Sequence, residues 1–296
     1  MLTWQPPDLS TLRLALAALV TLFLPGLAWT AWRPFNDRRD ALEQLADSAA
    51  ISLSLTALLA LFFFVAGIPI QASTLRILYL LCLMLWIAGL GRRMWHFRKQ
   101  PIQSAGLAWL TLGLLALAGV LVWRMYQARD LVLPAWVDSV HHSLIVQKFL
   151  SHGGLPNSLA PELPHLFSYH YGSHALIALF CALSGMEPAP ALLWFGQWIN
   201  ALLALTAYRA GRSFHLSQPA SLLALLLVGF AFQMPAYYLS WGRIPLPAGL
   251  ILLGSAQAAA LMLNQQRQAR PAWLRLTLLT TRSEEHTSEL QSPNTI

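Results

Sequence analysis

The chain has 296 residues, of which 56% are hydrophobic and 10% are charged, and its mean hydropathy is +0.53. This composition excludes an ordinary soluble domain and predicts an all-α, polytopic membrane bundle, because several apolar runs approach the roughly 20 residues that cross a bilayer. The formal net charge of +7 does not indicate nucleic-acid binding. Arg and Lys lie mainly in short loops between apolar runs, where they set membrane orientation. Cys82 and Cys181 lie in apolar stretches, so we expect neither a disulfide framework nor a zinc spacing.

The apolar runs predict seven complete spans and a truncated eighth. The first is expected to remain in the protein, because no signal-peptide cleavage pattern accompanies it. The complete runs cover 9–32, 45–66, 74–91, 102–124, 189–210, 218–238 and 246–264, and the truncated one covers 271–281. We divide the chain into N-terminal membrane helices at 1–101 and a core at 102–281, with a large loop at 125–188 that carries short interfacial helices.

The last segment, 282–296, is expected to be an artefact and not protein. Its stretch RSEEHTSELQS, at 282–292, is the translation of a common sequencing adapter. Removing its one Arg and three Glu residues leaves 18 basic and 9 acidic residues, a net charge of +9.

The basic loops predict which side of the membrane each connection faces. The apolar segment 174–185 is only about a dozen residues long, too short to cross. If it does not cross, the basic groups near 33–39, 92–99, 209–212 and 267–270 all share one face, which the positive-inside rule assigns to the cytoplasm. The loop at 125–188 and the turn at 240–245 then face outward.

The outer loop gathers six of the nine histidines of the chain. A polar group is costly to bury in apolar surroundings, so titratable side chains beside the spans indicate a site. The six are His141, His142, His152, His165, His170 and His174.

The motif WVDSVHH places a carboxylate beside two imidazoles. His141 and His142 follow Asp138 at i+3 and i+4, which on a helix brings the three side chains to one face, where an Asp and a His can share a proton. Asp138 or Ser139 could instead simply cap a helix that runs to Ser151, and both roles can coexist. We expect this helix to lie on the membrane surface through an apolar face of Val140, Leu144, Val146 and Leu150.

The motif YHYGSH supplies Tyr169, His170 and His174. The i, i+4 spacing of the two histidines would point them the same way on a helix, as in some metal sites, but the Glu of HExxH is absent. Interface anchoring and sugar binding are the other interpretations of these side chains. The sequence leaves metal binding open.

The turn WGRIP joins two predicted spans on the outer side. The guanidinium of Arg243 could bind phosphate oxygens in a bidentate manner, with Trp241 beside it, or could extend to lipid headgroups. Arg129 and Lys148 are rival cations.

With these features the chain resembles the GT-C superfamily of membrane glycosyltransferases, in its large and mostly uncharacterised bacterial and archaeal branch. Those proteins place an acidic residue in the first large outer loop, follow it with a short surface helix, and resume with a span that ends in basic residues inside. Asp138, the segment YHYGSHALIALF and the span ending YRAGR match this layout over about 102–264, and LPG at 24–26 and WGRIP at 241–245 look like that branch.

The resemblance implies transfer of a sugar from a polyprenyl-phosphate donor to an acceptor hydroxyl on the outer face of a prokaryotic plasma membrane. Asp138 would be the general base, His141 or His142 would orient it, and Arg243 would steady the leaving phosphate. Tyr169, His170, His174 and Trp241 would bind substrate. Many members carry two neighbouring acids where this chain has Asp138 and Ser139, which leaves a divalent cation as an open alternative.

Two other classes fit the sequence. A transporter or metal permease could use the histidines for selectivity or proton relay, although such sites usually lie at mid-membrane. A non-catalytic subunit of an envelope-assembly complex is the third.

Overall fold

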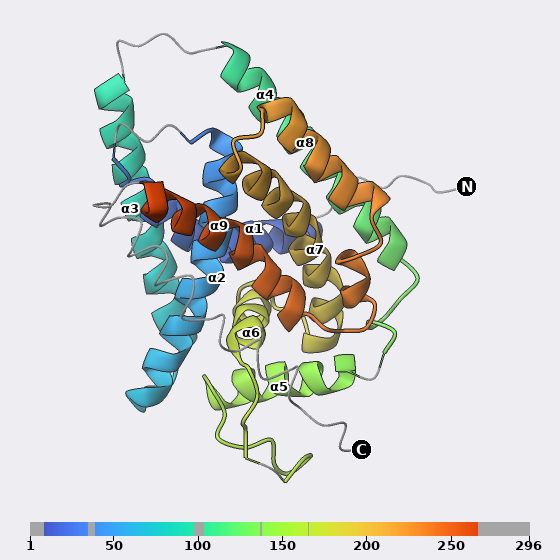
Figure 1. Cartoon of the computed structure of the whole chain (residues 1–296). Helices are drawn as coiled ribbons and strands as arrows, with labels where there is room; N and C mark the ends of the chain where they lie inside the picture. Colours follow the sequence, from blue (N-terminus) through green and yellow to red (C-terminus); the bar gives the residue numbers. More distant parts are fainter. Residues whose placement is uncertain (1–8, 35–38, 98–103, 137, 165, 266–296) are drawn as a thin grey trace.

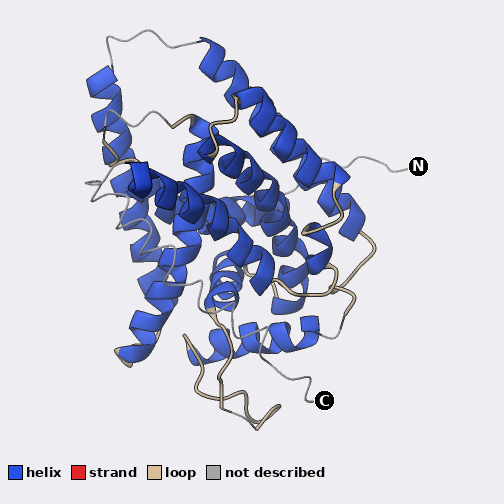
Figure 2. Ribbon diagram, in the orientation of Figure 1, coloured by secondary structure: helices blue, strands red, loops and turns tan. Residues whose placement is uncertain are grey.

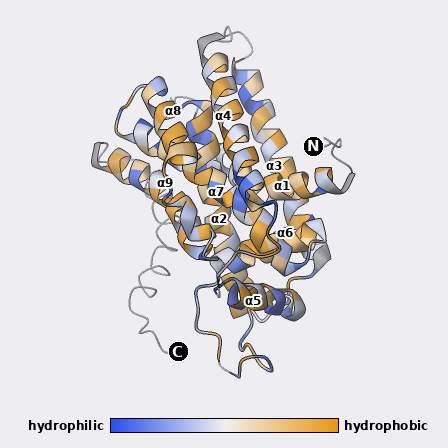
Figure 3. Cartoon of the chain, turned by 90° about the vertical axis from the view of Figure 1, so that its right-hand side faces the viewer, coloured by the Kyte–Doolittle hydropathy of each residue, from blue (hydrophilic) through white to orange (hydrophobic). Residues whose placement is uncertain are grey.

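The structure, a computed structural model, describes residues 9–34, 39–97, 104–136, 138–164 and 166–265, and this part of the chain is helical without a β-strand (Figure 2). Six helices are long and apolar enough to cross a membrane, which confirms a membrane helical bundle. They are α1 (Leu9–Thr30), α2 (Ala41–Val65), α3 (Ala72–Phe97), α4 (Ser104–Ala128), α7 (Pro188–Ser213) and α9 (Pro245–Gln265). Figure 3 shows that these helices are predominantly hydrophobic along their length.

The run at 218–238, expected to be a span, does not form one continuous helix. Nine residues of α8 (Gln218–Leu226) continue as the five-residue π-helical turn η1 (Leu227–Ala231), and Phe232 is extended. The buried Arg124 of α4 donates from Nη2 to the carbonyl oxygen of Gly229, 2.7 Å away. A backbone carbonyl needs a partner in apolar surroundings, so this contact stabilises the irregular turn. The run 271–281 lies outside the described residues.

The bundle is built around α7, which packs against α2, α4, α8 and α9 (Figure 1). Its side chains Phe195, Ile199 and Tyr208 are almost fully buried. The short helices α5 (Asp138–His152) and α6 (Gly172–Ser184) and the 3-10 turn η2 (Ala236–Leu239) complete the fold. Figure 1 shows α5 lying crosswise below α6 and α7, at one end of the bundle.

The Pro25–Gly26 pair allows α1 and α2 to cross closely. A Cβ on Gly26 would lie 1.8 Å from the carbonyl oxygen of Ser48, so only glycine fits. The Gly26 N–H donates to Ser52 Oγ at 2.9 Å, and the hydroxyls of Thr30 and Ser48 are 2.9 Å apart. The LPG motif therefore has a packing role in this chain.

A charge network joins α2 to α7 at the end of the bundle opposite α5. Arg209 donates from Nε to Asp47 Oδ1 and from Nη1 to Glu43 Oε1, each at 3.0 Å, and all three side chains are at most 8% exposed. Asp40 caps α2 in a capping box with Glu43 and accepts from Tyr208 and Arg212 of α7. Buried charges in a bundle persist when paired in this way.

The basic ends of several helices gather at the network end. Arg92 of α3 donates to the carbonyl oxygen of Arg33, just after α1, and the ends of α2 and α7 meet through Asp40 and Arg212. At the opposite end, the turn between α2 and α3 meets the end of α5 through a hydrogen bond from Ile70 N to Gly153 O. The arrangement agrees with short basic loops on one face and the 125–188 loop on the other.

Replacing Gly26 by Ala should destabilise the bundle by about 1–3 kcal/mol or more, because the new methyl overlaps the α2 backbone. Gly106→Ala is the matched control, since its Cβ meets nothing within 4 Å, and it should gain up to about 1 kcal/mol of helix propensity. Unfolding midpoints in detergent compare the two; equal midpoints would contradict the close α1–α2 crossing.

Replacing Arg209 by Met should cost about 3–5 kcal/mol, because Asp47 and Glu43 lose their buried counter-charge. The same change at Arg76, which is exposed on α3, should stay within about 0.5 kcal/mol. Guanidinium unfolding of the two purified variants measures the difference, and a neutral Arg209→Met would show that the network is dispensable.

Candidate functional site

Helix α5 supplies both the acid and one histidine of the site. Its buried residues are Ser139, His142, Ile145, Val146 and Phe149. Of the residues expected on its apolar face, Val146 is buried, whereas Val140 is 59% exposed and Leu150 is 39% exposed. Contact of this face with the membrane surface stays a prediction.

The WGRIP turn docks directly on the first turn of α5. Gly242 has φ +75 and its backbone lies so close to α5 that a Cβ would be 2.7 Å from the Ser139 nitrogen. Glycine alone adopts this conformation at no steric cost. The contact brings Arg243 to Asp138, with Nε 3.3 Å from Oδ2. Two residues 105 positions apart in sequence thus form an ion pair.

The Asp138–Arg243 pair is open to solvent. The two side chains are 47% and 50% exposed, which leaves oxygen atoms of the acid and nitrogen atoms of the base accessible to another molecule. Exposed ion pairs contribute little to stability, typically below about 1 kcal/mol. The contribution of the Asp138–Arg243 pair to the free energy of folding is therefore too small to explain why the two residues are paired.

A cluster of aromatic side chains lies beside Arg243. Its guanidinium lies over the Trp241 ring, 5.2 Å from the centroid. Trp241 in turn contacts Trp136, Tyr237 and Tyr238, with ring centroids 6.4, 5.2 and 5.9 Å away. The Trp241 Nε1 atom is buried, and no acceptor for it occurs in the part of the chain that the structure describes. Flat apolar rings with polar edges suit contact with a sugar ring.

A buried pair of imidazoles links α5 to α6. His142 Nδ1 and His174 Nε2 are 2.8 Å apart, and the two residues are 4% and 1% exposed. At this distance one ring donates an N–H to the other, so one of the two facing nitrogens carries a hydrogen and the other accepts with its lone pair. The contact also holds α6 against α5.

Tyr169 covers this imidazole pair. Its ring centroid is 5.9 Å from both His142 and His174 and 3.7 Å from His170, which is itself buried. The expected i, i+4 alignment of His170 and His174 on one helix was wrong, because α6 begins at Gly172 and His170 precedes it. The two imidazoles still lie in one cluster, because both contact the ring of Tyr169.

The structure places most of the sequence-predicted residues in two neighbouring groups. Asp138, Trp241 and Arg243 form the first group, and His142, Tyr169, His170 and His174 form the second. Asp138 and His142 are one helical turn apart on α5, so the groups adjoin. His141 is exposed on the same helix and His152 is exposed at its end. His165 lies outside the described residues.

Sequence reasoning did not count Trp136, Ser139, Tyr237 and Tyr238 among the site residues, and it considered Ser139 only as a helix cap. The aromatic pair at 237–238 precedes WGRIP directly, which is a usable signal, whereas Trp136 and Ser139 acquire their positions only through the docking of the turn. Aromatic residues near both ends of a loop are typical of membrane interfaces and do not by themselves indicate a site.

Lys148 of α5 holds the loop that follows this helix. Lys148 donates to the carbonyl oxygen of Ala160 at 2.6 Å and pairs with Glu162, which fixes the segment leading to Tyr169. The hydrogen bond from Lys148 lowers the pKa of the Glu162 carboxyl. Glu162 therefore stays charged to a lower pH than an isolated Glu. The Lys148–Glu162 ion pair is retained above this lowered pKa and is lost as the pH falls through it. Lys148 is thus engaged away from the Asp138–Arg243 pair.

No group of three His, Cys, Asp or Glu side chains that could hold a metal ion occurs among the described residues. The Nδ1 and Nε2 atoms of the buried imidazole pair face one another. The chemistry that the two groups offer directly is a carboxylate, a guanidinium, aromatic faces and hydrogen-bonding imidazoles.

Comparison with protein-family models, curated proteins and solved structures yields no match for this chain.

Replacing Gly242 by Ala should release the WGRIP turn from α5, because a methyl there combines an unfavourable φ with overlap on Ser139. The strain of about 1–2 kcal/mol should raise amide hydrogen exchange in 238–245 and 138–142 by about an order of magnitude. Gly91→Ala, whose Cβ meets nothing within 4 Å, should leave both segments unchanged. Unaltered exchange in Gly242→Ala would contradict the docking.

Proposed function

We propose that this protein is an integral-membrane glycosyltransferase resembling the GT-C superfamily, which moves a sugar from a polyprenyl-phosphate donor to an acceptor hydroxyl. The observation that supports this most is the accessible Asp138–Arg243 pair, 3.3 Å apart at the end of the bundle. A carboxylate and a guanidinium are the two groups that such a transfer needs, one for the proton and one for the departing phosphate.

The donor phosphate binds Arg243 first. A phosphate offers the guanidinium paired, charge-assisted hydrogen bonds, so it competes with Asp138 for the same nitrogen atoms. Once its partner turns to the phosphate, the Asp138 carboxylate is free to accept a proton. The resting ion pair therefore keeps the base occupied until the donor arrives.

The carboxylate then takes the proton of the acceptor hydroxyl. The hydroxyl oxygen attacks the anomeric carbon of the sugar as the bond from that carbon to the phosphate oxygen breaks, and the electron pair leaves with the phosphate. Arg243 stabilises the negative charge that develops on this oxygen. The Trp241 cluster presents ring faces to the sugar, and Tyr169, which is 40% exposed, donates a hydrogen bond to a substrate hydroxyl. The buried imidazoles of His142, His170 and His174 hold the Tyr169 ring in position.

Membrane orientation follows from the basic loops. Because Arg212 at the end of α7 and the cations of the short loops are cytoplasmic under the positive-inside rule, α5 and the WGRIP turn face outward. The proposed location is the plasma membrane of a prokaryote, with donor and acceptor bound at its outer surface.

Asp138→Asn should reduce transfer by about 10² to 10⁴-fold, because the amide cannot accept the proton. The measurement uses purified full-length protein in vesicles with a panel of radiolabelled undecaprenyl-phosphate sugars and a bacterial lipid extract as acceptor. The matched control is Asp130→Asn. Asp130 is 80% exposed and pairs with Arg129, and its variant should retain activity.

Full activity of Asp138→Asn, with normal insertion and unfolding, would remove the base assignment. Equal losses in Asp130→Asn and Asp138→Asn would indicate a general charge effect at the membrane surface and not catalysis.

The buried imidazole pair also favours a second function, a proton or metal relay in a transporter. Two hydrogen-bonded histidines can pass a proton between their rings. Uptake of protons or divalent metal into vesicles, abolished by His174→Gln and unaffected by Asp138→Asn, would support this alternative and exclude the transferase.

A further inference from the structure

The contact between α5 and α6 joins one imidazole from each helix. His142 and His174 meet with nitrogen atoms 2.8 Å apart and are 4% and 1% exposed. Val146 and Leu176, further along the same two helices, are fully buried. A polar group in such surroundings depends on its partner, because water does not replace a lost hydrogen bond there. The α5–α6 interface therefore includes a contact whose strength depends on the protonation of two rings.

The facing nitrogens can share one hydrogen but not two. In the neutral pair, one ring donates its N–H and the other accepts with a lone pair. A first added proton can bind the outer nitrogen of the donor ring, which leaves this hydrogen bond in place. A second added proton has to bind the facing nitrogen of the acceptor ring, so that two N–H groups oppose each other. The contact at 2.8 Å cannot persist in that state.

Few titratable groups lie on the described helices that pack around this pair. Helix α7 carries none before Tyr208 and α9 carries none, although both contact α6. The one such group of α1, Arg13, donates to the carbonyl oxygen of Leu183, at the other end of α6. The acids of α2, Glu43 and Asp47, belong to the charge network at the opposite end of the bundle.

The titratable groups that face the pair come from α5, the WGRIP turn and the loop before α6. The ring centroid of Tyr169 is 5.9 Å from both imidazoles and 3.7 Å from His170. Asp138, the only acid of α5, lies one turn before His142 and is paired with Arg243. Desolvation opposes a second positive charge on the buried pair, so acid favours separated, hydrated rings. The other titratable groups of α5 and α6 lie on the exposed face or further along: His141, Lys148, His152 and Cys181.

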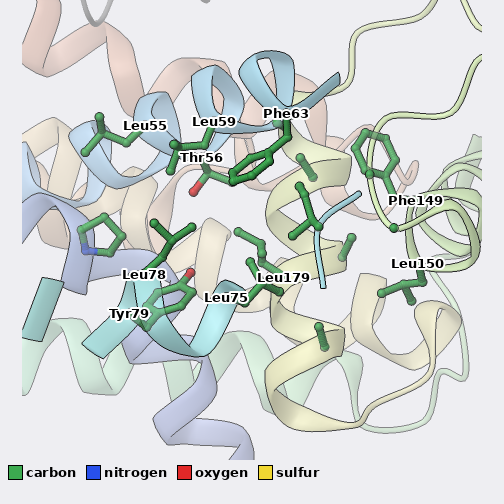
Figure 4. Close-up of a pocket in the computed structure, with 18 of the residues that line it drawn as sticks. Leu55, Thr56, Leu59, Phe63, Leu75, Leu78, Tyr79, Phe149, Leu150 and Leu179 are labelled. Atoms are coloured by element: carbon green, nitrogen blue, oxygen red, sulfur yellow. The ribbon is translucent and has the colours of Figure 1, made fainter. Parts of the chain in front are cut away.

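An apolar cavity of about 300 Å³ beside this contact gives both helices room to move. It lies between α2, α3 and α6, against the last turns of α5. Figure 4 shows Phe149 of α5, Leu179 of α6 and Leu78 of α3 among the side chains that line it. Ala175, which follows His174 directly, also lines it. A densely packed interior resists displacement, whereas a helix that borders a cavity can shift at a lower cost.

Separation of the two rings affects the candidate site through Tyr169 and through α5. The Tyr169 ring contacts both imidazoles, so it loses this support when they separate. Asp138 lies one turn before His142 on the same helix, so a shift of α5 moves the carboxylate relative to Arg243. The proposed sugar contact and the proposed base are then both displaced.

We propose that the His142–His174 contact is an acid-sensitive switch of the candidate site, which holds α5 on α6 near neutral pH and opens when both rings are protonated. An isolated imidazole has a pKa of about 6.5, and a coupled pair takes up its second proton at lower pH than its first, so opening falls in the range of about pH 5 to 6.5. Since the open state binds more protons, the closed state gains stability as the pH rises. The effect on transfer rests on the proposed function, whereas the opening does not.

Hydrogen exchange tests the switch without a substrate. The full-length protein in detergent is exchanged at about pH 7.5 and about pH 5, and protection factors, which correct for the intrinsic effect of pH, are compared for 139–146 and 173–179. Both segments should lose protection by about tenfold or more in acid, since opening gains a factor of about ten per pH unit below the second protonation. The Lys148–Glu162 ion pair remains formed there, because the pKa of Glu162 is lowered. Unchanged protection would overturn the proposal.

His174→Gln should remove the response to acid. Its amide has both a donor and an acceptor, so it can pair with His142 in either protonation state, and protection should change by less than about twofold between the two pH values. His141→Gln, on the exposed face of α5, is the matched control and should lose protection as the wild type does. If His174→Gln does not fold, His142→Gln carries the same comparison. A wild-type loss in the folded pair variant, or no loss in His141→Gln, would overturn the assignment to the pair.

Transfer assays link the switch to the site. Relative to its own rate at neutral pH, the wild type should lose more transfer in acid than His174→Gln does; an equal decline would overturn the link. A protein that opens in acid but transfers no sugar would retain the switch and remove the proposed function. A protein that transfers sugar, loses transfer in Asp138→Asn and keeps constant protection would retain the function and remove the switch.

Discussion

The fold depends on the requirement that a polar group inside an apolar bundle must have a partner. Arg209 meets it with two carboxylates of α2, and the irregular turn after α8 meets it through the guanidinium of Arg124. The two buried imidazoles, one on α5 and one on α6, satisfy this requirement by hydrogen bonding to each other. These contacts are directional, so they fix the order and rotation of the helices that nonspecific apolar packing alone leaves free.

The same requirement separates the candidate site from the rest of the molecule. The charges at the α2–α7 end are buried and mutually satisfied, whereas the Asp138–Arg243 pair is about half exposed and retains unused hydrogen-bonding positions. A closed network of the first kind holds structure. An open pair of the second kind can exchange its partner for a ligand, and this difference is why the proposed chemistry is assigned to α5 and the WGRIP turn.

Much of the architecture follows from hydropathy, since six of the expected spans correspond to the six long apolar helices and the long loop contains α5 and α6 as expected. The run at 218–238 shows the limit of this reasoning: its composition is apolar throughout, yet η1 and Phe232 interrupt it. A partner from another helix supports that interruption, and hydropathy within one segment carries no information on such a contact. The charge network was missed for the same reason, although the spacing of Asp40, Glu43 and Asp47 places them on one face of α2.

For the candidate site, the sequence suggests a set of residues, which stays a prediction, but not the way they are arranged. Asp138 and Arg243 were singled out separately, but only the docking of Gly242 on Ser139 shows that they meet. For His170 and His174, the expected alignment on one helix was wrong, because α6 begins at Gly172, after His170. Local periodicity cannot report a contact made across the fold.

The placement of Arg243 two residues before α9 has a mechanical consequence. That helix is anchored further along by Ser255, whose hydroxyl donates to Asp47 at 2.8 Å. A helix bends little over a few turns. Helix α9 therefore holds the guanidinium of Arg243 at a nearly fixed distance from the buried charge network. The precision with which the cation is held is therefore set partly by residues that no substrate touches.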